Sequence, residues 1–278
     1  MWKNILGHKK EIALLQKAIQ ENKLAHAYLF SGIEGIGKYT VALGLAKALE
    51  CKSDLQILEP QGTTIKIEAI RELKETAYLH PLEGKAKMIL IDQADTLTDA
   101  AANALLKILE EPPSQTYFIL ITPKPLKLLP TIRSRCQNLE FSPLPTDLII
   151  QKLLQEGMAP EEAKQRALLG EGSLKQAIEL DIALAEQIEK ELQQLGNKPP
   201  PSEIFKTAQN WIDDEEKIPQ LLGILNHLWH QKIVAQNNET GREITIQQWN
   251  AIQNAGRGLE SYANKQLLME NLLFTLTA

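Results

Sequence analysis

The sequence predicts an α/β fold in which helices cover a parallel sheet, followed by an all-helical C-terminal part. Short apolar runs alternate with stretches of helical periodicity up to about residue 145. A glycine-rich segment joins one of these runs directly to a helix. Strand signals largely disappear after residue 146, while helical patterns continue. Such alternation is typical of parallel strands joined by crossover helices.

The first strand and the glycine-rich segment lie close to the beginning of the chain. Apolar residues at helical spacing predict an amphipathic helix over Ile5–Glu21. The apolar run from Ala27 to Phe30 predicts a buried strand, and the Ala- and Leu-rich stretch from Lys38 to Glu50 predicts a helix. A strand, a glycine loop and a helix follow one another in the order that a phosphate-binding loop requires. A glycine turn in an ordinary α/β unit remains the alternative.

Further elements follow in the same alternation. Helices are predicted at 65–79, 98–111 and 128–134, and strands at 87–95, 117–121 and 139–141. Thr98 or Asp99 is a suitable N-cap for the second of these helices, and Pro112–Pro113 end it. Helical patterns then run from Asp147 to about Gln194. The segment LGNKPPPSE, 195–203, reads as a linker to a second helical block.

Composition excludes several classes of protein. With 278 residues and 44% hydrophobic residues, the chain can bury a large core. Its formal net charge of −5 gives no general basic surface for nucleic acid. No apolar run approaches the roughly 18 residues that cross a bilayer, and the N-terminal stretch lacks the apolar core of a secretory signal. We therefore expect a cytoplasmic protein without membrane contact.

The segment SGIEGIGKYT, 31–40, carries most of a nucleotide-binding motif. Gly32, Gly37 and Lys38 fit the P-loop pattern, in which backbone amides and a lysine hold phosphates. The pattern next requires a Ser or Thr hydroxyl for magnesium, and this chain has Tyr39 there. Thr40 is a poor substitute, because one residue along a helix rotates the side chain by about 100°. The loop is thus expected to hold phosphate without the usual metal ligand.

A second departure occurs in the segment ILIDQAD, 89–95. A hydrophobic strand that ends in Asp92 resembles the strand that places a carboxylate beside magnesium in P-loop enzymes. Hydrolysing members of that class carry Glu at the next position, where this chain has Gln93. An amide cannot accept a proton at neutral pH, so Gln93 cannot serve as general base. Together, Tyr39 and Gln93 predict nucleotide binding without hydrolysis.

Three further motifs stand out: HAYLFSG (26–32), NALLKILEEPP (103–113) and TIRSRC (131–136). Together they resemble the bacterial clamp-loader proteins of the AAA+ class, and within that family they are most similar to the delta-prime type. The resemblance extends from about Ile5 to Phe141 and continues weakly through GEGSLKQAIEL, 170–180. The stretch YANKQLLMENLLFTL, 262–276, resembles the last helix of the family's oligomerisation domain.

The resemblance assigns roles to individual residues. The phosphate loop would comprise Gly32, Gly35, Gly37 and Lys38, with Asp92 on the metal side. Thr122 matches the first sensor, and Lys175 stands where hydrolysing relatives have a second-sensor arginine. Arg135 matches the arginine finger that one subunit points at its neighbour's nucleotide. Thr122 ending a strand, Lys175 as a solvated residue and Arg135 as an ordinary surface arginine remain the alternatives.

The resemblance also implies domains and partners. An AAA+ domain over 1–145 would be followed by a helical lid over 146–195 and a helical collar over 196–278. The collar would join delta and gamma/tau subunits in a ring that loads the sliding clamp onto primed DNA. DNA contact is expected at the helix starts near 64–66 and 98–100. In that setting the chain would be a stator of the DNA polymerase III holoenzyme and not catalytic alone.

No cofactor is expected to be required, although ATP or ADP can bind. Many relatives carry a four-cysteine zinc module, but here Cys51 is followed by no cysteine until Cys136, so we expect no zinc or other metal site. Two other functions remain open. One is an active gamma-type ATPase subunit, and the other is a stand-alone AAA+ DNA-remodelling motor, such as a branch-migration helicase.

Overall fold

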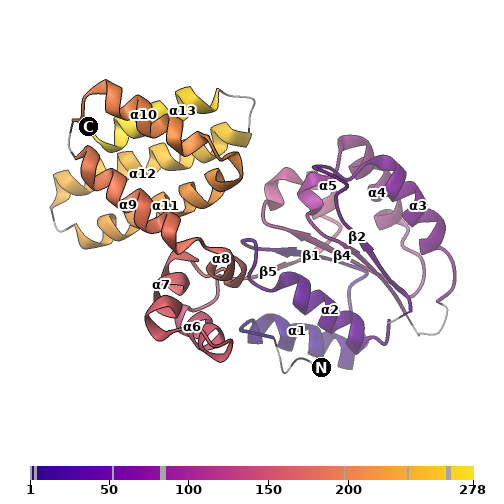
Figure 1. Cartoon of the computed structure of the whole chain (residues 1–278). Helices are drawn as coiled ribbons and strands as arrows, with labels where there is room; N and C mark the ends of the chain where they lie inside the picture. Colours follow the sequence, from indigo (N-terminus) through magenta and orange to yellow (C-terminus); the bar gives the residue numbers. More distant parts are fainter. Residues whose placement is uncertain are drawn as a thin grey trace. The chain divides into compact units, whose positions relative to one another are not determined.

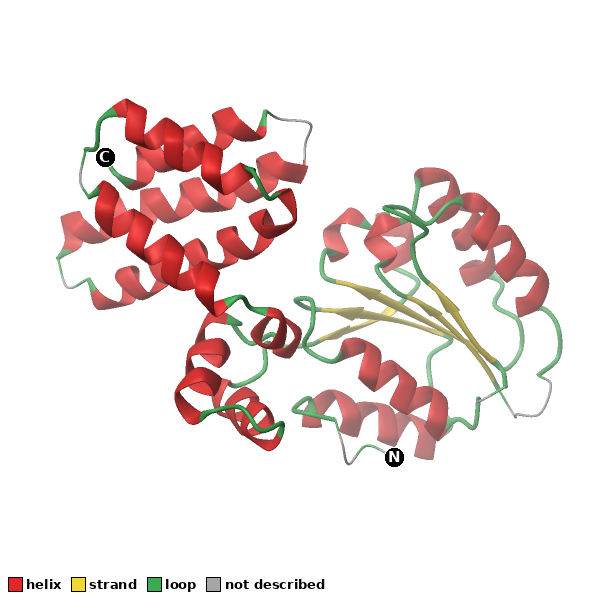
Figure 2. Ribbon diagram, viewed as in Figure 1, coloured by secondary structure: helices red, strands yellow, loops and turns green. Residues whose placement is uncertain are grey.

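The computed structural model describes residues 2, 5–51, 53–81, 86–196, 198–236, 238–260 and 264–278. The chain divides into two compact units, Met1–Ala177 and Ile178–Ala278. The first unit contains the sheet and the second is helical, as Figure 2 shows.

The sheet of the first unit has five parallel strands among the described residues, in the order β2-β3-β4-β1-β5. Ala27 of β1 pairs with Phe118 of β4, and Tyr28 pairs with Gln137 of β5. This order places β1, which leads into the glycine loop, between β4 and β5. The strands are β1 (Ala27–Ser31), β2 (Leu55–Leu58), β3 (Lys87–Ile91), β4 (Thr116–Thr122) and β5 (Gln137–Glu140).

Both faces of the sheet are covered by helices (Figure 1). Successive strand residues point to opposite faces, so Phe30 of β1 belongs to one apolar cluster and Leu29 to the other. The Phe30 side packs against α1 (Lys9–Gln20) and α2 (Lys38–Ala48). The Leu29 side packs against α3 (Ile67–Ala77), α4 (Asp99–Glu110) and α5 (Pro130–Arg133). Strands that are buried on both faces have continuously apolar sequences, because side chains on either face meet one of the two apolar clusters.

Two local differences from the sequence prediction have physical causes. Strand β2 was not predicted, because it is a four-residue edge strand whose side chains are only half-buried or exposed. Helix α1 begins at Lys9 rather than Ile5, since Gly7 and His8 adopt left-handed backbone angles with φ of 70° and 53°.

The N-cap proposed for α4 is confirmed, as the Thr98 hydroxyl accepts a hydrogen bond from the Ala101 amide at 3.3 Å.

Three short helices follow the sheet and pack on its Phe30 side. They are α6 (Thr146–Gln155), α7 (Pro160–Leu169) and α8 (Leu174–Glu179), of which α8 runs across the boundary between the units. Buried residues of all three, including Ile149, Ala163 and Ala177, join the same apolar cluster as Phe30. One-turn 3-10 helices lie at η1 (Ala94–Thr96) and η2 (Pro125–Lys127).

The second unit packs long helices around buried tryptophans. The Trp211 indole of α10 donates to Glu191 of α9 at 2.6 Å, and Trp229 of α11 donates to Gln248 of α12 at 2.9 Å. A buried Trp usually needs a partner for its indole N–H. The predicted linker separates α9 from α10, and residues 262–263 of the predicted last helix lie outside the described residues. The helices are α9 (Ile182–Leu195), α10 (Pro201–Ile212), α11 (Ile218–Ala235), α12 (Glu239–Glu260) and α13 (Lys265–Leu276), with η3 (Glu215–Lys217) before α11.

Candidate functional site

The glycine loop between β1 and α2 has the backbone of a phosphate cradle. Gly32, Gly35 and Gly37 have φ of 141°, 76° and 105°, which L side chains rarely adopt. A Cβ at Gly32 would also lie 2.4 Å from the carbonyl oxygen of Phe141. Gly37 is the N-cap of α2, so the first free amides of that helix face the loop. The three predicted glycines are therefore required by conformation.

Lys38 folds back over this loop. Its ammonium donates to the carbonyl oxygens of Gly32 at 2.7 Å and Ile33 at 2.6 Å. The side chain is almost fully buried, and burial lowers the pKa of Lys38, an effect that the nearby carboxylate of Asp92 opposes. Lys38 thus lies at the centre of the loop, where the motif places it.

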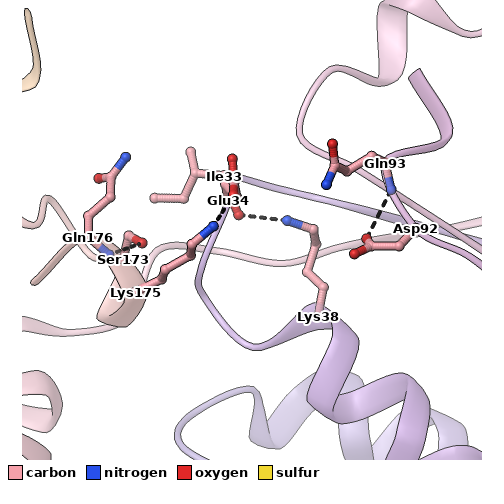
Figure 3. Close-up of polar contacts among 8 residues, drawn as sticks. All are labelled: Ile33, Glu34, Lys38, Asp92, Gln93, Ser173, Lys175 and Gln176. Atoms are coloured by element: carbon pink, nitrogen blue, oxygen red, sulfur yellow. Dashed lines mark hydrogen bonds and ion pairs between the residues drawn. The ribbon is translucent and has the colours of Figure 1, made fainter. Parts of the chain in front are cut away.

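Asp92 follows β3 and lies opposite Lys38 (Figure 3). Its carboxylate accepts a hydrogen bond from the Gln93 amide at 2.9 Å. Burial raises the pKa of Asp92, while that hydrogen bond and the charge of Lys38 act to lower it. Gln93 is exposed and adopts a left-handed φ of 48°. The structure therefore brings the two predicted residues of opposite charge together.

Tyr39 occupies the position of the missing metal hydroxyl. Its ring packs against the apolar cluster on the Phe30 side of the sheet. Burial raises the pKa of Tyr39, and the carboxylates of Glu59 and Asp92 raise it further. A protonated phenol is a poor magnesium ligand, because hard divalent cations favour carboxylate, carbonyl and water oxygens. The loop thus fits a phosphate group, whereas the hydroxyl that would hold magnesium is replaced by a ring.

Thr122 ends β4 and is completely buried. Its hydroxyl donates to the Asp95 carboxylate at 2.6 Å and accepts from the Lys124 amide at 2.9 Å. Asp95, which sequence reasoning did not single out, is therefore the carboxylate that Thr122 contacts. The signal for Asp95 was present, since it stands three residues after Asp92 in the same motif.

Lys175 lies at the start of α8 and reaches the glycine loop. Its ammonium forms an ion pair with Glu34 at 2.7 Å, and its amide donates to the Gly35 carbonyl at 3.2 Å. The His8 ring also contacts the loop, through a hydrogen bond with the Ile36 carbonyl at 2.6 Å. Glu34 and His8 were not predicted, because nothing in a local pattern shows which side chain supports a loop from outside.

Arg135 makes its hydrogen bonds with helices α4 and α5 and not with the glycine loop. Its guanidinium donates to the Thr131 carbonyl of α5 at 3.0 Å and to the Glu110 carboxylate of α4 at 2.7 Å. About a third of the side chain is exposed. The two contacts use two of the five N–H donors of the guanidinium and hold it in place.

The two thiols do not form a common site. Cys51 is buried and Cys136 half-buried, and burial raises the pKa of each to about 11. Among the residues that the structure describes, no group of three or more His, Cys, Asp or Glu side chains is arranged to hold a metal ion. Within the same described ranges, no helix is long and apolar enough to cross a membrane.

Comparison with known proteins places this geometry in a family. A family model described as DNA polymerase III, delta subunit, matches residues 7–54 and 52–145, which together span half of the chain. The chain belongs to this family. The matched part contains the glycine loop, Asp92, Thr122 and Arg135, so the family assignment and the site rest on the same residues.

Two similar proteins are named as DNA polymerase III subunits. The chain is 37% identical over 188 residues to the DNA polymerase III subunit delta' of Bacillus subtilis, covering 60% of this chain and 57% of that protein. It is 33% identical over 211 residues to the DNA polymerase III subunit tau of Escherichia coli, covering 66% of this chain and 33% of that protein. The aligned part of the chain thus spans less than two thirds of either relative.

Two solved structures are similar to this chain, and the first of them shares its fold. A variant of RuvB from Thermotoga maritima is 19% identical, with a TM-score of 0.50, covering 69% of this chain and 65% of that chain. A DNA polymerase III gamma subunit-related protein from the same organism has 20% identity and a TM-score of 0.49, covering 95% and 98% of the two chains. The predicted fold class, an α/β domain with a parallel sheet followed by helices, is confirmed.

Proposed function

We propose that this member of the DNA polymerase III delta-subunit family is a delta-prime-type subunit of the replicative clamp loader. In this role it joins delta and gamma/tau subunits and helps load the sliding clamp onto primed DNA. The single observation that carries the proposal is the combination of an accessible arginine, Arg135, with a phosphate loop that lacks the residues for hydrolysis. A subunit of this kind contributes chemistry to a neighbour rather than to its own site.

The phosphate loop binds ATP or ADP without turning it over. Support comes from the left-handed glycines and from Lys38 at the loop centre. Tyr39 and Gln93 replace the metal hydroxyl and the general base. When nucleotide is bound, its phosphates would be held by the amides of the loop and by Lys38, with Asp92 at the metal side.

Arg135 acts as the arginine finger for a neighbouring ATPase subunit. Its anchored guanidinium is permanently charged and can donate to two phosphate oxygens at once. Charge that develops on the transferring phosphoryl group makes this contact stronger in the transition state than in the ground state. Lys175 takes the place of the second sensor, and Thr122 that of the first.

Domains are proposed at 1–145, 146–195 and 196–278, with the last one as the assembly domain. Direct DNA contact by this chain is proposed to be weak. The starts of α3 and α4 carry Glu68 and Asp99 in their first turns. A surface hollow of about 310 Å³ beside α3 is lined by Glu59, Glu68 and Glu72 and by Lys66, so its carboxylates outnumber its ammonium groups. Carboxylates repel DNA phosphates, so the assembled complex would hold most of the DNA.

Mixing the chain with purified delta and gamma subunits tests the proposal. We expect a monomer alone and one copy in a heteropentamer, measured by mass in solution. Self-assembly into a hexamer without partners would instead indicate a stand-alone motor. ATP turnover by the isolated chain would indicate a gamma-type ATPase subunit, an alternative favoured by the similarity to the tau subunit.

A further inference from the structure

The start of α8 packs directly against the backbone of the phosphate loop at Gly35. A Cβ added to Gly35 would lie 2.4 Å from both the Cβ of Lys175 and the Oγ of Ser173. The Lys175 amide also donates to the Gly35 carbonyl oxygen at 3.2 Å. The loop and the helix therefore approach as closely as a glycine allows.

A side-chain contact lies beside this backbone contact. The Lys175 ammonium is 2.7 Å from the Glu34 carboxylate, although the two residues are 141 positions apart in sequence (Figure 3). The exposed fractions of the two side chains are 51% and 60%, so water reaches the pair. Lys175 therefore contacts the loop twice. Its backbone amide binds Gly35, and its ammonium forms an ion pair with Glu34.

The position of Glu34 within the loop gives its charge a second effect. Its carboxylate is close enough to influence the ionisation of both Lys38 and Asp92. Nucleotide phosphates held in the loop would meet this carboxylate, and charges of like sign repel. The same carboxylate neutralises Lys175, the cation that the family would use on the nucleotide.

We propose that Glu34 is an internal anion that engages Lys175, holds α8 against the phosphate loop and lowers the affinity of the loop for nucleotide. This inference rests on the phosphate-binding role proposed above. In the nucleotide-free chain, Glu34 supplies the negative charge at Lys175 that a phosphate would otherwise supply. A bound nucleotide and Glu34 then compete for the ammonium of Lys175. Nucleotide binding is therefore linked to the release of α8 from Glu34.

The size of the effect follows from the exposure of the pair. Half-exposed ion pairs change an equilibrium by no more than about fivefold. The backbone contact at Gly35 remains when the pair is broken, so loss of Glu34 should loosen α8 without unfolding the unit. The proposal therefore predicts a measurable shift in affinity in an otherwise intact protein.

The test compares Glu34→Gln with wild type by two measurements on the full chain. Hydrogen exchange of residues 173–179 without nucleotide should be faster in the variant. The affinity for a fluorescent ADP analogue should rise by up to about fivefold. Glu156→Gln is the matched control, because Glu156 forms a comparable pair with Lys152 at 3.0 Å on α6.

Lys175→Gln separates the two effects of Glu34. This substitution also breaks the ion pair with Glu34, so hydrogen exchange in α8 should become faster. The carboxylate of Glu34 remains and still repels phosphate, so the affinity for ADP should not rise. If exchange in Glu34→Gln equals that in Glu156→Gln, Glu34 does not hold α8 and the proposal is wrong. If α8 loosens and ADP affinity stays at the wild-type value, the competition is wrong. Absence of ADP binding by all variants overturns the phosphate site itself along with the competition.

Discussion

The Nη2 atom of Arg135 lies 2.7 Å from the Oε1 atom of Glu110. The pair joins the end of α4, within NALLKILEEPP, to the segment that precedes β5, within TIRSRC. Two motifs that carry the family resemblance are thus in direct contact. Since both side chains are partly exposed, the pair orients Arg135 more than it stabilises the fold.

Arg135→Ala should slow clamp loading in a reconstituted complex while folding and assembly remain normal. Arginine fingers in related phosphoryl-transfer systems contribute on the order of 10³-fold or more in rate at their own site. The total ATPase of a ring with several sites should fall only partly. The measurement is the loading rate on primed DNA, with pentamer formation checked by mass.

The control for this experiment is Arg71→Ala, an exposed arginine on α3. Arg133 is less suitable, although it lies two residues away, because its Nε atom is buried and has no hydrogen-bond partner among the residues that the structure describes. Its removal would also change local packing. Wild-type loading by Arg135→Ala would mean that the guanidinium is structural and takes no part in a neighbour's site.

The isolated chain should hydrolyse ATP no faster than Lys38→Ala. Neither Tyr39 nor Gln93 can supply the function of the residue it replaces. Phosphate release at saturating ATP and magnesium is the measurement, with circular dichroism to confirm that Lys38→Ala folds. Steady turnover that disappears in Lys38→Ala would show an active site and contradict the stator role.

Thr122→Val should lower the free energy of unfolding by about 0.5–1.5 kcal/mol, the net contribution of a typical hydrogen bond, because Asp95 is half-buried and Lys124 exposed, so water can reach both partners. The valine would keep the shape but remove the 2.6 Å bond to Asp95 and the acceptor for the Lys124 amide. Urea denaturation measures the change, and Thr122→Ser, which keeps the hydroxyl, should lose less. Equal stability of Thr122→Val and wild type would indicate that the bond contributes nothing.

Stability at alkaline pH should depend on Cys51. Burial, with a smaller contribution from Asp54, raises the pKa of this thiol to about 11. In the unfolded chain a thiol ionises near pH 8.5. The contribution of the neutral thiol to the free energy of unfolding is therefore fully present below about pH 8.5. This contribution is lost as the pH rises towards about 11.

The measurement compares wild type with Cys51→Ala in urea at several pH values. The advantage of wild type over the variant should shrink above about pH 8.5. Cys136, whose pKa is raised in the same direction, is present in both proteins and cancels in the difference. A difference that stays constant with pH would contradict the raised pKa of Cys51.

A truncated chain that ends after Glu179, the last residue of α8, should stay folded and fail to enter the pentamer. The first unit ends at Ala177, and α9 lies within the second unit, where Glu191 accepts a hydrogen bond from Trp211 of α10. Ending at Gln194 instead would leave the buried face of α9, with Ile188, exposed to water. Thermal melting and size-exclusion with delta and gamma subunits test this, and normal incorporation would contradict a C-terminal assembly domain.

Several elements were predictable because their causes are local. The buried strands are continuous apolar runs, and α4 has its cap and its proline stop within the segment itself. The glycines of the phosphate loop stand where the backbone needs a positive φ. Strand β2 was missed because an edge strand buries less and therefore needs fewer apolar residues.

The sequence by itself determined the α/β order, the loop with Lys38, and the two departures at Tyr39 and Gln93. Only the tertiary structure decided which polar side chains meet there. Glu34 contacts Lys175 from 141 residues away, and Thr122 contacts Asp95 from 27. The physical reason is that a periodic pattern reports the environment of one element, whereas a hydrogen bond between elements depends on the path of the chain that joins them.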